Sequence, residues 1–277
     1  MSKGISANVG GSYQQAKASY VNVNGTWTKF GGVTDAVVSN SPTKTYSSGG
    51  HTYHVFEFTA SGTLNVTQSG VARVLVVGGG GGSGAGTASH YGGGGGGGGG
   101  MLDGIVFLEA ASHPVTVGAA GSHPASGSGK PGTQGNDSAI GTDGKIVGFG
   151  GGFGAGQSAG SIGSVGGSGG GQYGASTNRG VTGQGYSSSQ SNYIRGPNGG
   201  GAGGAGVQGS GQAEGSYGPG RFSDISGTSV EYSRGGGGGM QPKPGTQNYG
   251  NGGSAEYGNN NAFELPQQGV VIVEVKV

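Results

Sequence analysis

The stretch GVVIVEVKV, residues 269–277, decides how the rest of this sequence is interpreted. Strict alternation puts four valines on one face of a β-strand and, on the other, two apolar residues followed by two charged ones. The first face carries Val271, Val273, Val275 and Val277, and the second carries Val270, Ile272, Glu274 and Lys276. A strand this apolar needs partners, and the comparable strands all end by Phe149. The chain between must therefore leave a sheet and return to it.

Partner strands are predicted in the region from Thr52 to about Phe149. Six blocks there are rich in β-branched or aromatic residues, and each is bounded by Gly, Ser or Pro. They are YHVFEFT (53–59), LNVT (64–67), VARVLVV (71–77), IVFL (105–108), VTV (115–117) and IVGF (146–149). Residues 60–63, ASGT, supply turn residues between the first two blocks.

Glycine islands alternate with mixed segments between about residues 150 and 268. The islands cover residues 163–174, 196–206, 235–239 and 250–253, and two earlier ones cover 78–86 and 92–100. Nothing in this region has the 3.6-residue periodicity of a helix. We therefore expect essentially no α-helix.

The islands can be ordered only if their backbone groups find partners, because glycine loses more backbone freedom on folding than any other residue. An extended helix with three residues per turn has no internal hydrogen bonds, so its N–H and C=O groups point outward. Several such helices of pure glycine can pack side by side. The nine-glycine run 92–100 would give a rod of roughly 28 Å. The alternative is a flexible glycine linker, although linkers are not usually split by aromatic segments such as those around Tyr186 and Tyr193.

The sequence therefore predicts an all-β fold: a β-sandwich or jelly-roll-like sheet with an inserted bundle of polyglycine II helices. We expect two domains. Residues 1–48 form an N-terminal docking or connecting module, with a hairpin in YVNVNGTWTKF (20–30) because Asn24-Gly25 separates two β-prone runs. The alternative is a locally ordered tail that binds nothing. Residues 49–277 form the glycine-rich domain, with its polyglycine layer and variable loops mainly in 150–268.

Composition excludes several classes of protein. Glycine accounts for 76 of 277 residues, which alone would suggest disorder. Only 9% of the residues are charged, however, so charge repulsion does not keep the chain unfolded. The net charge is +1 with no basic cluster, so no nucleic-acid partner is expected. Cysteine is absent, which removes disulfides and thiolate metal sites. No segment resembles a membrane span or a secretory signal. We therefore expect that the protein is made in a host cytoplasm and does not insert into a membrane.

Enzymatic motifs fail one by one. Matches to GxGxxG occur repeatedly, as glycine abundance dictates, and none opens a helix. Gly129-Lys130 is followed by Pro131, which breaks a phosphate-loop pattern. The five histidines lack zinc-site spacing, and the aspartates are isolated from one another. We therefore predict no enzyme, no catalytic residue, no cofactor and no metal site.

The order of the motifs resembles a glycine-rich domain common in phage tail-fibre and tail-tip proteins. The resemblance rests on YHVFEFTASGTLNV (53–66), VARVLVVGGGGGSG (71–84) and QGVVIVEV (268–275). The glycine region also resembles the separable adhesins at the tips of T-even-type long tail fibres. That likeness implies a polyglycine sandwich that presents variable segments as receptor-binding loops. The long β-rich region and the N-terminus differ from those adhesins, so the attachment mode does not carry over.

Some animal receptor kinases have glycine-rich regions of similar composition. The absence of cysteine and of a signal segment argues against that likeness.

Candidate binding residues are the tyrosines, arginines and phenylalanine that separate the later islands, in loops at about 175–195 and 207–234. Tyr and Arg on rigid loops give large contact area and directional hydrogen bonds at little entropic cost. The candidates are Arg179, Tyr186, Tyr193, Arg195, Tyr217, Arg221, Phe222, Tyr232 and Arg234. The alternative for any single tyrosine is that it caps the end of the glycine layer.

These patterns predict a tail-fibre tip adhesin of the virion, without catalysis. Its expected partners are a bacterial outer-membrane receptor, protein or lipopolysaccharide, and a tail-fibre or tail-tip protein that binds the N-terminal region. The main alternative is a structural virion component, a decoration or connector protein. Two further alternatives are an ice-binding protein, disfavoured by the unequal islands, and a disordered or silk-like polymer.

Overall fold

A computed structural model describes residues 34–277 except 88–91, 143–144, 158–161, 174–176, 178, 192–195, 209–214, 240–247 and 256–263. In the N-terminal region it describes the backbone of four strands: β1 (Ser6–Val9), β2 (Ser12–Gln15), β3 (Ser19–Val23) and β4 (Thr26–Phe30). β3 pairs antiparallel with β4 from Val23 opposite Thr26, within the segment where the sequence predicts a hairpin. Every regular element in the described part of the chain is a strand, so the all-β prediction is confirmed.

The first large sheet has five strands in the order β10-β9-β18-β7-β6. Their bounds are β10 (Met101–Leu108), β9 (Gly70–Val77), β18 (Val270–Lys276), β7 (His51–Phe58) and β6 (Lys44–Ser48). β18 lies between β9 and β7 and is antiparallel to both, with Val273 opposite Val74 and Phe56. The closing strand therefore returns to the centre of the sheet, as its composition predicts.

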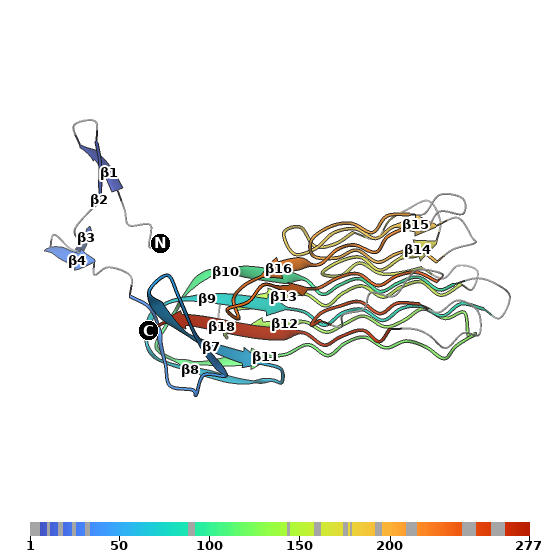
Figure 1. The fold of residues 1–277 in the computed structure, drawn as a ribbon, viewed down its shortest axis with the longest axis horizontal. Helices are drawn as coiled ribbons and strands as arrows, with labels where there is room; N and C mark the ends of the chain where they lie inside the picture. Colours follow the sequence, from blue (N-terminus) through green and yellow to red (C-terminus); the bar gives the residue numbers. More distant parts are fainter. Residues whose placement is uncertain are drawn as a thin grey trace.

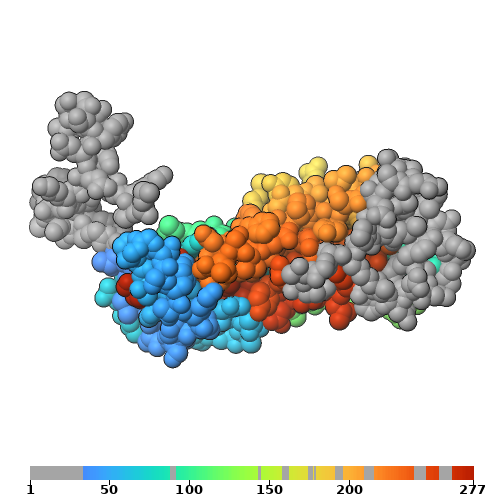
Figure 2. Space-filling model, viewed as in Figure 1, coloured from blue at the N-terminus to red at the C-terminus, as the bar shows by residue number. Residues whose placement is uncertain are grey.

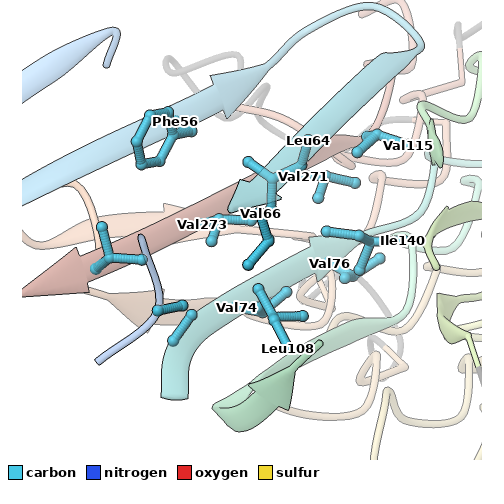
Figure 3. Close-up of a cluster of buried hydrophobic side chains, with 13 residues drawn as sticks. Phe56, Leu64, Val66, Val74, Val76, Leu108, Val115, Ile140, Val271 and Val273 are labelled. Carbon is cyan, nitrogen blue, oxygen red and sulfur yellow. The ribbon is translucent and has the colours of Figure 1, made fainter. Parts of the chain in front are cut away.

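The second sheet has the order β13-β12-β11-β8-β5. These strands are β13 (Ile146–Gly148), β12 (Ser138–Ile140), β11 (Ser112–Thr116), β8 (Gly62–Gln68) and β5 (Val37–Val38). Apolar side chains of both sheets meet between them, among them Leu64, Val115, Val76 and Val271 (Figure 3). The two sheets thus form a sandwich. The finer jelly-roll connectivity stays a prediction.

The other face of the first sheet is also covered. Val270 and Ile272 pack there with Leu75, Ile225 and Tyr232. Ile225 and Tyr232 belong to a short hairpin, β16 (Arg221–Ser223) and β17 (Val230–Tyr232), which lies against residues of β6 and β7 (Figure 2). Both faces of β18 are therefore buried, which explains why its two faces are equally apolar near its start.

Beyond the sheets, the glycine islands extend as a layered stack of straight, nearly parallel segments (Figure 1). We call this stack the glycine slab. It comprises residues 78–86, 92–100, 118–122, 130–137, 149–157, 163–171, 184–191, 196–206, 215–220, 233–239, 250–255 and 264–269. Two very short strands lie at its border, β14 (Gln172–Tyr173) and β15 (Gln190–Ser191), which pair in parallel.

Hydrogen bonds between slab segments repeat every three residues. Along residues 78–86, every third N–H donates to the same neighbouring segment, at 2.8–3.0 Å. One face bonds to the run 92–100, with pairs Gly78–Gly100, Gly81–Gly97 and Gly84–Gly94, and the next bonds to 130–136, with pairs Gly79–Asn136, Gly82–Thr133 and Ala85–Lys130. A repeat of three is the signature of the polyglycine II conformation. The predicted packed helices are therefore present.

The nine-glycine run 92–100 lies in the interior of the slab. The N–H groups of three consecutive glycines, 94 to 96, donate to three different segments, through Ala155, Pro197 and Gly253. The carbonyls of the same glycines accept from three others, through Gly84, Gly171 and Gly236. One helix thus contacts six neighbours and has all its described residues buried. This packing requires glycine, because a Cβ on Gly96 would lie 2.0 Å from the carbonyl oxygen of Gly81.

Candidate functional site

A cleft of about 610 Å³ opens on the side of the slab near the sheets. Its walls come from three parts of the chain: residues 177–187, the pair Ala202-Gly203, and Arg221. Three of the nine predicted binding residues line it, namely Arg179, Tyr186 and Arg221. The fold therefore brings together candidates that are up to 42 positions apart in the sequence (221 − 179).

A tight turn at residues 181–184 forms one border of the cleft. The N–H groups of Gln184 and Gly185 both donate to the carbonyl of Val181 at 3.0 Å. Gly183 has a φ of +82°, which a side chain would strain. The Gln184 side chain anchors the turn, because its amide donates to Val147 O at 2.9 Å and its Oε1 accepts from the Phe149 N–H at 3.0 Å. The turn is thus fixed to the end of β13.

Tyr186 is held by its backbone and displays its ring. Its N–H donates to Gly201 O at 3.1 Å, and its carbonyl accepts from the Gly169 N–H at 3.0 Å. The side chain is 51% exposed. An aromatic ring fixed in this way loses little conformational entropy when it contacts a ligand.

The two arginines differ in how firmly they are placed. Arg221 begins β16, and its Nη2 donates to the carbonyl of Met101 at 2.6 Å. Arg179 is exposed on the opposite segment. No described residue of the lining is a carboxylate, so the described lining carries positive charge.

An ion-pair network holds the β16–β17 hairpin, and with it Arg221, against the first sheet. Arg73 on β9 binds Asp103 through two nitrogens, each at 2.9 Å, and Asp224 through Nη1 at 2.6 Å. Ser223 also donates to Asp103 at 2.7 Å. The hydrogen bond from Arg73 lowers the pKa of the Asp224 carboxyl below its ordinary value. The β16–β17 hairpin is therefore attached to the first sheet by ion pairs as well as by apolar packing.

A second polar contact lies beside this network. The Tyr46 hydroxyl donates to Glu274, a carboxylate that is buried on β18. Burial raises the pKa of Glu274 above its ordinary value, despite the opposing effects of Tyr46 and Arg73. Burial likewise raises the pKa of Tyr232 to about 12. These groups stabilise the sheet face under the hairpin and do not reach the cleft lining.

The remaining predicted residues are dispersed. Phe222 is 65% exposed, outside the cleft. The Arg234 guanidinium lies 5.2 Å from the centre of the Tyr217 ring, and Arg234 is buried. Tyr232 is 3% exposed and packs in the core, so its expected place in an exposed loop is wrong. Tyr193 and Arg195 lie outside the described residues.

Sequence reasoning missed the small polar residues of the cleft. Thr177, Thr182 and Ser187 line it, yet Ser and Thr occur throughout the glycine region and carry no distinguishing pattern. It also missed a second cleft of about 510 Å³ between residues 121–126 and the pair Leu265-Pro266. Leu265 is 59% exposed there, and the neighbouring His123 Nδ1 lies 2.9 Å from the Ser83 hydroxyl.

Two features are absent from the described part of the chain. No group of three or more His, Cys, Asp or Glu residues is close enough to hold a metal ion. No helix in that part of the chain is both long and apolar enough to cross a membrane.

Comparison with known families agrees with the fold. A family model described as a glycine-rich domain matches residues 59–276. The match covers most of the chain, from the end of β7 to the end of β18, so the chain belongs to this glycine-rich domain family. No curated protein sequence matches it.

Proposed function

We propose that this glycine-rich domain protein is a bacteriophage tail-fibre or tail-tip adhesin that binds a receptor on the bacterial surface. The observation that supports it is the cleft, where Arg179, Tyr186 and Arg221 converge on a rigid backbone framework. Recognition concentrates on loops held by rigid scaffolds. A scaffold whose shape depends on backbone hydrogen bonds leaves its loop side chains available for binding.

The proposed mechanism is adsorption without catalysis. Tyr186 supplies contact area, and the two arginines supply charge-assisted hydrogen bonds, which are stronger than neutral ones. Because the slab holds the cleft in place before the receptor arrives, binding loses little conformational entropy. Tyr232 and Arg234 are assigned a supporting role, since both are buried.

The N-terminal region completes the proposal. Its two hairpins, β1–β2 and β3–β4, precede the point where the chain joins the sheets at Thr34, whose carbonyl accepts from the Val71 N–H at 2.9 Å. This region would attach the protein to a tail-fibre or tail-tip partner in the virion.

A structural virion component is the second candidate. The burial of Tyr232 and Arg234 favours it, because two of the nine predicted contacts serve the fold and not a ligand. In that case the slab would contribute only resistance to heat and proteases.

The test is binding of the labelled, purified chain to a panel of intact bacteria, with competition against phage adsorption. The panel includes strains that lack outer-membrane proteins or lipopolysaccharide sugars. We expect saturable binding that disappears in one class of strain and weakens about tenfold or more in Tyr186→Ala, the size typical of an interface hot spot. Phe107→Ala is the control, because Phe107 is 60% exposed on β10, away from the cleft. Absence of binding across a broad panel would favour the structural role.

A further inference from the structure

We infer that the ligand of the cleft is an acidic glycan, a saccharide chain that carries phosphate or carboxylate groups. The inference rests on the proposed function and names the chemistry of the receptor. It is carried by four properties of the described lining residues: their charge, the number of glycines, their hydroxyl content and the scarcity of large apolar side chains.

The charge of the lining residues indicates that the ligand is an anion. Of the described lining residues, two are arginines and none is an aspartate or glutamate. The two carboxylates that follow Arg221 among the described residues are engaged elsewhere: Asp224 is paired with Arg73 at 2.6 Å, and Glu231 accepts from the Gly220 N–H at 2.8 Å. Guanidinium groups bind phosphate and carboxylate through paired hydrogen bonds. An anionic ligand therefore fits the cleft better than a neutral one.

The shape of the cleft indicates the size and form of the ligand. Four of the lining residues are glycines, at positions 180, 183, 185 and 203, so a ligand can approach the backbone closely. A volume of about 610 Å³ is within the range of sites that enclose small molecules. A short stretch of a saccharide chain is of this size, and its rings are flat enough to lie along a glycine wall.

The remaining side chains suit sugar hydroxyls. Thr177, Thr182 and Ser187 each add a hydroxyl that both donates and accepts. Tyr186 adds an exposed ring on which a sugar ring can stack. The combination of hydroxyls, one aromatic face and two guanidinium groups matches a charged sugar at every polar position.

A protein loop fits less well. The cores of protein interfaces are enriched in apolar and aromatic residues. Among the described residues that line this cleft, only Ala202 and Tyr186 have an apolar group larger than the side chain of glycine, serine or threonine, apart from the arginine stems. A porin loop would therefore find few large apolar side chains to pack against here, which makes a protein receptor the competing outcome of the test.

The experiment measures binding of the full chain to three immobilised oligosaccharides of equal length. Polygalacturonate fragments carry carboxylates, phosphorylated mannan fragments carry phosphates, and dextran fragments are neutral. The variants are Arg179→Gln, which removes an exposed charge inside the cleft, and Lys130→Gln, which removes an exposed charge outside it. Circular dichroism and melting temperature confirm that both variants fold.

We expect at least one acidic fragment to bind tenfold or more tightly than dextran. Arg179→Gln should lose about tenfold in affinity, and Lys130→Gln should bind as the unmodified chain does. Affinity should fall with added salt, since charged contacts are screened. The preferred fragment identifies phosphate or carboxylate as the recognised group.

The inference is overturned if the three fragments bind equally or not at all, or if the two variants lose the same affinity. Failure of the proposed function is a separate result. Suppose that bacteria bind the chain, that acidic fragments do not compete for this binding, and that protease treatment of the cells abolishes it. The receptor is then a protein, and the adhesin role stands. If acidic fragments bind in the expected pattern but no bacterium does, the cleft chemistry stands and the adhesin role falls.

Discussion

The sandwich and the glycine slab are continuous along the chain, yet they are stabilised in opposite ways. β9 passes directly into the slab between Val77 and Gly78, without a turn. Before that point, a strand bonds to two neighbours and buries side chains such as Val76 on its faces. After it, the glycine run 92–100 bonds to six neighbours and buries only backbone.

The difference shows what a side chain contributes to packing. In the sandwich, apolar area removed from water drives folding. In the slab, each hydrogen bond contributes only about 0.5–1.5 kcal/mol net, and the close approach of backbones adds dispersion energy. The slab must offset the large conformational entropy of glycine, so it depends on nearly complete pairing. The two regions should therefore respond differently to the same substitution.

The largest effect is expected for a side chain inside the slab. In Gly96→Val, the new Cβ would meet the Gly81 carbonyl oxygen at 2.0 Å, and backbone cannot give way there without breaking neighbouring bonds. We expect loss of the fold, a cost of more than about 4 kcal/mol. The matched control is Gly104→Val on β10, where nothing lies within 4 Å of a Cβ, and valine favours strands. Thermal melting of both variants checks this, and an unchanged melting temperature for Gly96→Val would show that the run is not packed as described.

A cavity in the sandwich should cost less than a side chain in the slab. Leu75 is fully buried on β9 beneath the β16–β17 hairpin. Leu75→Ala is expected to lower the free energy of unfolding by about 2–5 kcal/mol, as is usual for a large-to-small core substitution. Ile105→Ala serves as the control, since Ile105 is 77% exposed. Denaturant unfolding measures both, and equal losses would contradict the assignment of the core.

A smaller effect is expected where a side chain takes the place of backbone in the slab. Asn198 is 1% exposed; its Oδ1 accepts from the Gly238 N–H at 2.8 Å, and its amide donates to Val207 O at 2.9 Å. Asn198→Ala leaves both groups without their partner, which costs about 1–3 kcal/mol for a buried polar group. Thr182→Ala, at an exposed position in the turn beside the slab, should change stability little. Equal unfolding midpoints for the two variants would indicate that the amide contributes nothing.

The smallest effect is a pH dependence carried by the sandwich alone. The pKa of Glu274 is raised in the folded state, chiefly by burial, so the folded chain holds this proton more tightly than the unfolded chain. Its contribution to stability is therefore present below the ordinary glutamate pKa and falls as pH rises through the raised one. We expect that the free energy of unfolding, measured as a function of pH, changes less across this range in Glu274→Gln than in the unmodified chain. Parallel profiles for the variant and the unmodified chain would assign the dependence to another group.

Sequence patterns predicted the elements that carry strong local signals. The valine alternation of β18 predicts a strand, and the glycine runs, split by aromatic segments, favour packed extended helices over a flexible linker. Both predictions are confirmed. β12 has only three residues, SAI, and the first half of β10 contains Asp103 and Gly104, so neither has a strand-like composition. Their pairing depends on the strands beside them: β12 lies between β11 and β13, and β10 pairs with β9 across the glycine runs 78–86 and 92–100.

The candidate site was predictable only in part, for a related reason. Arg179 and Tyr186 are close in sequence, so a shared loop was a sound prediction. The position of Arg221 and the burial of Tyr232 depend on how the β16–β17 hairpin docks onto the sheet. That docking rests on the bond from Arg73 to Asp224, 151 positions away, which no local pattern reveals.

The central position of β18 has a consequence for biosynthesis. A ribosome makes β7 and β9 first and then the whole glycine slab, and only afterwards the strand that joins β7 to β9. Until then the first sheet lacks its central strand, β18, and the slab has no complete sandwich to pack next to. Folding should therefore be a late and slow event dominated by long-range contacts. A nascent chain that stalls before Val270 would expose two unpaired strand edges and become prone to aggregation.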